Sequence, residues 1–355
     1  MCLSGAKHCV GCCNCQHFHP VHTRDDLDWA NEGGWQVRPF EPKDSQLKRN
    51  KLARLLGAEL EIAGMFSQPK DFYKVCTKKW KARIMSDGSL PSNGFEMPTQ
   101  PAGGDLWLDM IKEMTDTIAA GKGYVNQQCG THLHVDTRDL DAQALYRVVK
   151  LYACVEPALY NVIHPQRSKN QYAAKCGQEL LTLFSKFTKS ANMADMETMF
   201  YATKVTVRTN EQTGKLEYSE GLGIGYVPAD KLSRGLKESI EATKAHKGFM
   251  RRYRGLNLHS HFFRGTIEFR LHHGTVNGET ITNWGLTLGS LVEWAKTHSE
   301  VDLLKLMSDT KEDPMLALSR VVVEVTGKNE MVDWLTQRAA AMKKYTKEVN
   351  FLGDR

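Results

Sequence analysis

The sequence predicts an α+β fold in which a mostly antiparallel sheet is backed by helices. Several segments alternate apolar and polar residues as strands do, and others repeat apolar residues every three or four positions as amphipathic helices do. These segments follow one another without the regular strand–helix–strand order of a parallel sheet. The chain also lacks a GxxxxGK[ST] loop and a GxGxxG turn between a strand and a helix, so neither a P-loop nor a dinucleotide-binding fold is expected.

Four segments are expected along the chain. Residues 1–22 form a Cys/His-rich segment, residues 23–50 a polar linker, and residues 51–300 the main domain. Residues 301–355 carry apolar residues at helical spacing in "VDLLKLM", "LALSRVVVEV" and "MVDWLTQRAAAMKKY". This spacing predicts a C-terminal helical extension.

The main domain contains all the predicted strands. In chain order we expect a strand in "RLLGAELEIAG", two short strands around a turn in "ARIMSDGSLPSNGFEMPTQP", a helix in "LWLDMIKEMTDTIAA", a strand in "THLHVDT", a long helix in "DAQALYRVVKLYACVEPALYNVI", a strand in "GTIEFRLHHGT" and a helix in "ETITNWGLTLGSLVEWAKTH". Gly64 and Pro165 end the first strand and the long helix.

Two of the predicted strands carry pairs of polar residues on one face. Glu59 and Glu61 share a face because strand side chains repeat every two residues, and His132 and His134 do the same. Two neighbouring carboxylates repel each other, and a divalent cation would offset that repulsion. The alternative for both pairs is an ordinary solvated or internally satisfied strand face.

A third strand, "GTIEFRLHHGT", repeats the pattern. Alternation places Glu268, Arg270 and His272 on one face and the apolar residues between them on the other. Arginine is the best planar partner for a phosphate or carboxylate, although Glu268 and Arg270 could also form a simple ion pair. One sheet with a polar concave face would gather all three segments into a cleft that binds cations through Glu and His and anions through Arg, as a metal–nucleotide site requires.

Five segments within residues 51–300 resemble the amidoligase family, carboxylate–amine ligases that share the glutamine synthetase fold. In chain order they are "GAELEI", "SDGSLPSNGFEMPTQP", "CGTHLHVD", "RYRGLNLHS" and "GTIEFRLHHGTVNGETITNW". The resemblance implies a glutamine synthetase-like fold, with a curved, mostly antiparallel sheet whose concave face binds Mg-ATP. Five segments in the same order point to the family, but they do not specify the substrate.

The resemblance also implies the roles of individual residues. Mg²⁺ or Mn²⁺ would be bound by Glu59, Glu61, Glu96, His132 and Glu268. ATP and substrate would be contacted by His134, Arg254, Asn257, Asp87 and Ser89. Arg270 would contact the transferred phosphate and would act in catalysis together with Glu268, Glu59 and Glu61.

The implied reaction joins a small-molecule or peptide carboxylate to an amine. ATP phosphorylates the carboxylate, and the amine then attacks the acyl-phosphate to give an amide or isopeptide bond. No protein nucleophile is needed, and Cys129 is interpreted as a small buried residue. Two alternatives remain at this point: a phosphotransferase on the same fold, and a non-enzymatic binding or structural protein that uses the ligase scaffold.

The first 22 residues carry a dense set of metal-binding residue types. They include Cys9, Cys12, Cys13, Cys15, His17, His19 and His22. Cys9 and Cys12 have the C-x-x-C spacing that forms half of many zinc sites. One interpretation is a structural Zn²⁺ knuckle that recruits a protein partner, and the other is a redox-sensitive tail.

Bulk composition restricts the other functional classes. The net charge of +6 is only mildly basic for 355 residues, so nucleic acid is not an expected partner. No apolar run approaches the roughly 20 residues that span a bilayer, and the first residues lack the apolar core of a signal peptide. The expected location is therefore the cytoplasm of a cell or host, where the nine cysteines are interpreted as thiols or metal ligands rather than disulfides.

Overall fold

The structure, a computed structural model, describes residues 43–202, 205–221, 225–246 and 249–345. Its centre is a five-stranded sheet in which every neighbouring pair is antiparallel. In spatial order the strands are β3 (Phe95–Pro98), β1 (Leu56–Ile62), β5 (Gly130–Asp136), β9 (Thr266–His273) and β8 (Leu256–Asn257). The predicted α+β fold with a mostly antiparallel sheet is thus confirmed.

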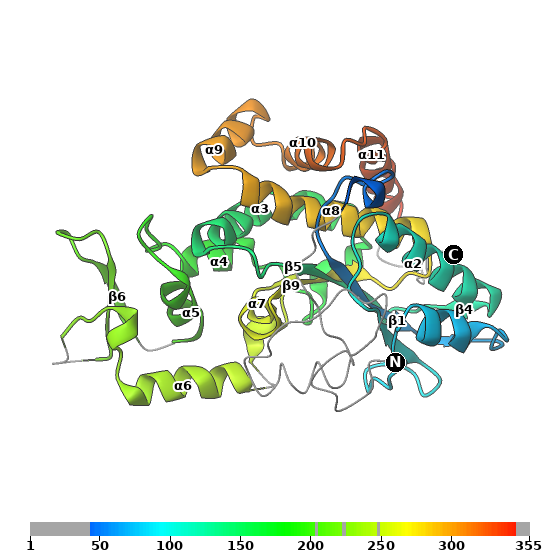
Figure 1. The fold of residues 1–355 in the computed structure, drawn as a ribbon, viewed down its shortest axis with the longest axis horizontal. Coiled ribbons are helices and arrows are strands. Elements are labelled where there is room, and N and C mark those ends of the chain that lie inside the picture. The colour runs from blue at the N-terminus through cyan, green and yellow to red at the C-terminus, as the bar shows by residue number, and fades with distance from the viewer. Residues whose placement is uncertain (1–42, 203–204, 222–224, 247–248, 346–355) are drawn as a thin grey trace.

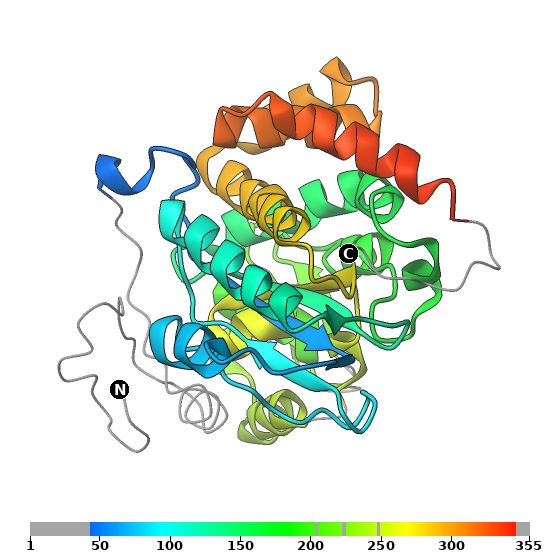
Figure 2. The same cartoon turned by 90° about the vertical axis from the view of Figure 1, so that its right-hand side faces the viewer.

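Helices cover one face of this sheet in two successive layers (Figure 1, Figure 2). The layer on the sheet consists of α2 (Gly104–Ala120), α3 (Ala142–Asn161) and α8 (Gly278–Thr297). The outer layer consists of α9 (Glu300–Asp309), α10 (Pro314–Thr326) and α11 (Glu330–Met342). α10 packs on both α3 and α8, so the predicted C-terminal helical extension is confirmed and is part of the packed structure.

The remaining elements lie around the sheet. The short strand pairs are β2 (Gly64–Met65) with β4 (Gly123–Tyr124) and β6 (Thr206–Thr209) with β7 (Leu216–Ser219). The other α-helices are α4 (Gly177–Leu183), α5 (Met193–Tyr201), α6 (Arg234–Ala245) and α7 (His259–Arg264). Short 3-10 helices occur at η1 (Asp44–Gln46), η3 (Pro165–Lys169), η4 (Ala229–Lys231) and η5 (Met250–Arg252), and η2 (Tyr73–Lys79) is a π-helix.

The two long helices behind the sheet begin at capping residues that closely follow strands. The Asp141 side chain accepts a hydrogen bond from the Ala144 amide at the start of α3, a few residues after β5 ends. The Asn277 side chain accepts one from the Thr280 amide at the start of α8, shortly after β9. Such caps satisfy amides that have no partner within the helix. They therefore fix where the chain turns from each strand onto the back of the sheet.

Alternation along β1 and β5 separates a core face from a polar face, as the sequence predicts. Leu60, Ile62 and Leu133 are fully buried and belong to the hydrophobic core that includes the helices. Each fully buried aliphatic side chain of this kind contributes about 1.5–3 kcal/mol through the hydrophobic effect. The acids and histidines at intervening positions consequently point to the opposite face of the sheet.

The second half of β9 departs from the predicted alternation. The pairing of β5 with β9 shifts register, because Thr131 pairs with His272 whereas Leu133 pairs with Phe269. This irregularity adds one residue to β9 and reverses the faces beyond it. The prediction that His272 shares the polar face with Glu268 and Arg270 is therefore wrong. The imidazole of His272 is buried and lies 5.1 Å from the Trp284 ring of α8, centroid to centroid.

One of the two short strands predicted around residues 83–98 is also missing. The second forms β3, but on the other side of the turn Met85 makes only an isolated bridge to Glu96. The Cys/His-rich segment and the possible zinc ligands Cys9, Cys12, Cys13, Cys15, His17 and His19 lie outside the described residues. Their interpretation stays a prediction.

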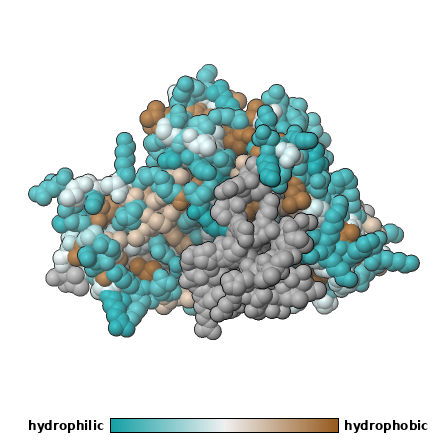
Figure 3. All heavy atoms as spheres, in the orientation of Figure 1, coloured by the Kyte–Doolittle hydropathy of each residue, from teal (hydrophilic) through white to brown (hydrophobic). Residues whose placement is uncertain are grey.

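The described surface is largely hydrophilic on the face shown in Figure 3, with smaller hydrophobic areas between the polar side chains. None of the helices among the described residues combines the length and the apolar character that a membrane crossing requires.

Candidate active site

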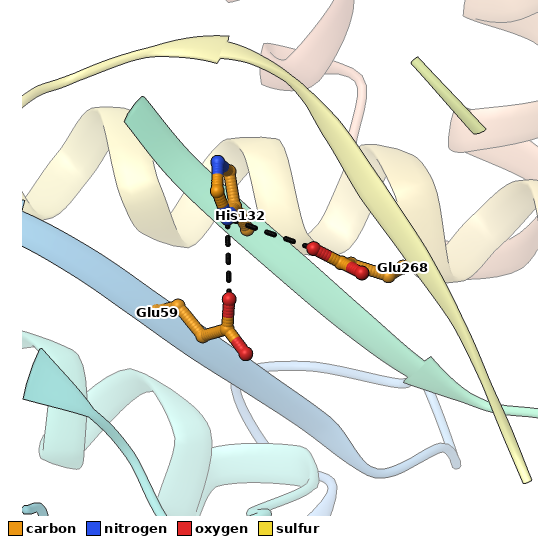
Figure 4. Close-up of side chains that lie close together, drawn as sticks. All are labelled: Glu59, His132 and Glu268. Atoms are coloured by element: carbon orange, nitrogen blue, oxygen red, sulfur yellow. Dashed lines mark hydrogen bonds and ion pairs between the residues drawn. The ribbon is translucent and has the colours of Figure 1, made fainter. Parts of the chain in front are cut away.

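The polar face of the sheet brings acids and histidines together across three strands (Figure 4). Glu59 of β1 is the direct cross-strand partner of His132 on β5. His134, two residues further along β5, is the partner of Glu268 on β9. Glu268 in turn pairs with Asn257 on β8. Direct partners have Cβ atoms about 4.5–5.5 Å apart, so the antiparallel register itself assembles this group.

Glu59, His132 and Glu268 form the tightest part of the site. The Nδ1 atom of His132 lies 3.1 Å from Oε2 of Glu59 and 3.6 Å from Oε1 of Glu268. One ligand-type atom from each of the three residues lies within 4.8 Å of the other two. Two carboxylates and an imidazole at this spacing are a suitable donor set for a divalent cation.

Two further acids extend the site toward the edge of the sheet. Glu61 and Glu96 are direct partners across β1 and β3. Oε1 of Glu61 lies 3.6 Å from Nε2 of His132, and Oε2 of Glu61 accepts a hydrogen bond from the Gly130 amide. A Cβ on Gly130 would lie only 2.8 Å from Nε2 of His132, so glycine leaves room for this imidazole.

The charges of the site shift the carboxyl pKa values in opposite directions. Burial would raise the pKa of Glu59, but His134 and His132 hold it well below its usual range. Burial opposes ionisation of Glu268 too, but the Arg270 guanidinium lowers its pKa to about 2. The pKa of Glu96 is raised to about 9 by burial and by the negative charges of Glu59 and Glu61.

These observations fit a bound divalent cation. Where Glu96 lies, negative charge exceeds the positive charge available, and a cation would offset that excess. The Oδ1 atom of Asn257 is buried and has no hydrogen-bond partner within the described residues, although its Nδ2 donates to Glu268 at 2.7 Å. Buried polar atoms are rarely left unsatisfied, so this oxygen is available to a bound group.

Arg270 lies beside the carboxylates as an ordered cation. Its Nη1 donates to Glu268, and its Nε donates to the carbonyl oxygen of Tyr172 at 3.2 Å. Burial opposes the charged form, but Glu268 and Glu59 raise the pKa of the guanidinium. Arg270 therefore remains positively charged next to the site, with a planar group suited to a phosphate or carboxylate.

A pocket of about 560 Å³ adjoins one end of this group of residues. Glu59 and His134 line it, and several of its other walls are apolar: Leu55, Leu56, Ala58, Pro98 and Pro101. The His134 ring is fixed at both nitrogens, because Nε2 lies 3.0 Å from Glu59 Oε1 and Nδ1 lies 2.9 Å from Thr266 Oγ1. Thr266 was not predicted as a site residue, since a single threonine at the start of a strand carries no distinctive pattern.

A second pocket, of about 270 Å³, lies toward the other end of β5. It is lined by Arg167, which the sequence analysis also missed, and by Cys129, which directly precedes β5. Burial lowers the pKa of Arg167 to about 10. Arg167 occurs in the turn η3 after a long helix, where neither strand nor helix periodicity marks it, so the sequence offers no signal for its position.

The other predicted site residues lie in different surroundings. Arg254 forms an ion pair with Glu179 of α4 at 2.7 Å, so its guanidinium is engaged away from the carboxylates. The Asp87 carboxylate accepts the Ser89 amide at 2.7 Å in a turn, and its charge contributes to the raised pKa of Glu96. Their proposed substrate contacts stay predictions. Cys129 is buried as predicted, and burial raises the pKa of its thiol to about 11.

The fold and the site define an α+β protein whose sheet gathers carboxylates, imidazoles and a guanidinium on one face. The model of the family described as "Putative amidoligase enzyme" matches residues 51–291 of the 355-residue chain. The chain therefore belongs to the amidoligase family.

Comparison with solved structures finds a protein described as a novel glutamine synthase homolog. The alignment covers 86% of this chain and 76% of the other, with 10% sequence identity and a TM-score of 0.33. No curated protein matches the sequence significantly.

Proposed function

We propose that this protein is an ATP-dependent carboxylate–amine ligase that forms an amide or isopeptide bond through an acyl-phosphate. The observation that carries the proposal is the convergence of Glu59, His132 and Glu268 beside Arg270 on one face of the sheet. Membership of the amidoligase family supports a ligase activity. ATP, Mg²⁺ and the acyl-phosphate belong to the proposal.

The carboxylate and imidazole groups would hold the cation. Glu59, His132 and Glu268 form the closest donor set, and Glu61 and Glu96 supply further oxygens nearby. A bound Mg²⁺ or Mn²⁺ would neutralise phosphate oxygens and so stabilise the charge that shifts during phosphoryl transfer. The protein residues hold these donors in place through the antiparallel register, before any ligand binds.

Arg270 would stabilise the phosphoryl group that is transferred. Glu268 and the Tyr172 carbonyl orient its guanidinium, which reduces the entropy lost when it binds an anion. In the first step the substrate carboxylate attacks the γ-phosphorus and the bond to ADP breaks. In the second step the neutral amine attacks the acyl carbon, inorganic phosphate leaves with the bonding electrons, and the amine nitrogen loses a proton to solvent.

The larger pocket is the best candidate for the nucleotide. Glu59 and His134 connect it to the carboxylates, and the apolar residues Leu55, Pro98 and Pro101 offer a surface for a purine base. The cation site would then lie between the nucleotide on one side and the pocket of Arg167 on the other. This arrangement would bring the γ-phosphate and the acceptor carboxylate together at the cation site.

An ADP-release screen tests the proposal. The full chain is incubated with Mg²⁺, ATP and mixtures of carboxylates and amines, and the products are analysed by mass spectrometry. A ligase releases ADP only when both a carboxylate and an amine are present, and it yields a product condensed with loss of water. ADP release with a stable phosphorylated product and no amine requirement would instead identify a phosphotransferase.

Two variants make this screen specific to the site. Glu268→Gln removes a charge next to His132 and should abolish ADP release. Glu217→Gln, on the hairpin strand β7, removes the same charge from an ion pair with Arg208 away from the site and should leave ADP release unchanged. ADP release that persists in folded Glu268→Gln would refute the proposed site.

A further inference from the structure

Arg167 is a buried cation with no carboxylate within ion-pair distance among the described residues. Its side chain is almost completely buried, and its Nη2 and Nε donate to the carbonyl oxygens of Arg270 at 2.8 Å and Leu271 at 3.4 Å. Among the described residues it forms no ion pair within 4.0 Å and its Nη1 makes no hydrogen bond, although the charge of Glu61 nearby acts to raise the pKa of the guanidinium. A buried charge without an ion pair is costly even where carbonyl oxygens accept its hydrogen bonds, so a site that keeps one is suited to a bound anion.

The surroundings of Arg167 match an organic anion. The pocket of about 270 Å³ is lined by four amide side chains, from Asn126, Gln127, Gln166 and Asn170. Amide groups donate hydrogen bonds to carboxylate oxygens and carry no opposing charge. None of the described residues that line this pocket is acidic.

The pocket adjoins the carboxylate site at Gly130. A Cβ built on Gly130 would lie 2.8 Å from Nε2 of His132 and 3.1 Å from Nη2 of Arg167. The imidazole and the guanidinium therefore border the same small space. A single ligand could therefore reach both groups. Its anionic end would contact Arg167, and its reacting end would lie beside His132 and Glu61.

We propose that Arg167 binds a substrate carboxylate that takes no part in the reaction. The substrate is then an amino acid, a peptide terminus or a dicarboxylate. This inference rests on the proposed ligase function for the reacting end of the substrate. Arg167 is then a specificity residue, since it contacts a part of the substrate away from the bond that forms. The guanidinium forms a charge-assisted hydrogen bond with the carboxylate through its Nη1.

Binding of small carboxylates to the full chain tests this proposal. Calorimetry with Mg²⁺ and a non-hydrolysable ATP analogue compares glutarate with butyrate, and L-alanine with L-alaninamide. Each pair differs in one carboxylate. Charge-assisted hydrogen bonds contribute about 1.5–3 kcal/mol, so we expect at least one pair to differ by about tenfold or more in Kd. Tighter binding of glutarate than of butyrate would show that Arg167 binds the carboxylate substrate. Tighter binding of L-alanine than of L-alaninamide would show that it binds the amine substrate.

Arg167→Gln should remove that preference while leaving butyrate and L-alaninamide binding unchanged. Because Arg167 also holds two backbone carbonyls, a second variant on the exposed rim avoids the core. Gln166→Glu places a negative charge at the pocket and should weaken carboxylate binding severalfold. Gln212→Glu makes the same charge change in the exposed turn between β6 and β7 and should have no effect.

The outcomes separate this inference from the ligase proposal. A carboxylate preference that depends on Arg167, in a protein that releases no ADP with any substrate, would refute the ligase and support the anion pocket. Condensation activity without any such preference would refute the anion pocket alone. So would a preference that survives in folded Arg167→Gln or that responds equally to Gln166→Glu and Gln212→Glu.

Discussion

Glu59 and His132 are direct cross-strand partners, and the Oε2 atom of Glu59 lies 3.1 Å from the Nδ1 atom of His132. Glu59 also contacts His134 through its other oxygen at 3.0 Å. One carboxylate thereby fixes both imidazoles of the β5 strand. This places Glu59 at the boundary between the larger pocket and the cation site.

Glu59→Gln should leave the fold intact and abolish ATP turnover. The amide keeps the volume but removes the charge that both histidines and a divalent cation require. Single groups that stabilise transition-state charge are typically responsible for about 10²- to 10³-fold in rate, so we expect a loss of at least about 100-fold. Steady-state ADP release, with circular dichroism for the fold, measures this effect. Near wild-type turnover in the folded variant would exclude Glu59 from the site.

Arg270→Lys should impair turnover while retaining the positive charge. The guanidinium contacts Glu268 and the Tyr172 carbonyl at the same time, and a lysine ammonium cannot reproduce that planar geometry. Loss of one charge-assisted hydrogen bond, about 1.5–3 kcal/mol, corresponds to a decrease of about tenfold or more in kcat. Single-turnover kinetics of ADP formation separates this effect from substrate binding. An unchanged single-turnover rate would argue against a contact with the transferred phosphoryl group.

Glu96→Gln should stabilise the metal-free protein and weaken its response to metal. Because the folded pKa of Glu96 is raised to about 9, the wild type is stabilised below the ordinary glutamate pKa and loses that stability as the pH rises toward 9. The advantage of the glutamine variant in EDTA should therefore grow over this range. Thermal denaturation at several pH values, with EDTA or with Mn²⁺, measures both effects.

Two results of this experiment would contradict the role given to Glu96. If Mn²⁺ raises the Tm of Glu96→Gln as much as that of the wild type, Glu96 contributes nothing to the cation. If the Tm difference in EDTA does not increase with pH, the excess of negative charge around Glu96 is absent in solution.

His272→Ala should reduce stability without weakening cation binding. The ring lies 4.2 Å from that of His273 and 5.1 Å from that of Trp284, centroid to centroid, inside the packed layer. Truncation of a large core side chain typically costs about 2–5 kcal/mol. His298→Ala, which removes a half-exposed imidazole stacked on Trp294, is the matched control with a smaller expected loss. Urea denaturation and Mn²⁺ titration distinguish the two effects, and a reversed pattern would place His272 on the polar face.

Much of the sheet could be predicted because β1, β5 and the first half of β9 alternate strictly. In these strands a period of two determines which side chains meet, and Glu59, His132 and Glu268 do meet. Residues after the irregularity in β9 could not be predicted, since the extra residue arises from pairing with β5 rather than from the local sequence. Arg167 could not be predicted as a site residue for a related reason, because tertiary packing alone brings its turn against Gly130.

The irregularity in β9 divides one strand between two tasks. In its first half, Glu268 and Arg270 point to the candidate active site, whereas His272 in its second half belongs to the hydrophobic interior. A mutational scan along this strand should therefore change in character near residue 270. Before it, catalytic defects at Glu268 should alternate with folding defects at Ile267 and Phe269, and after it folding defects alone are expected. Sequence variation in the first half of the strand would then be limited by the needs of the site, and variation in the second half by packing in the core.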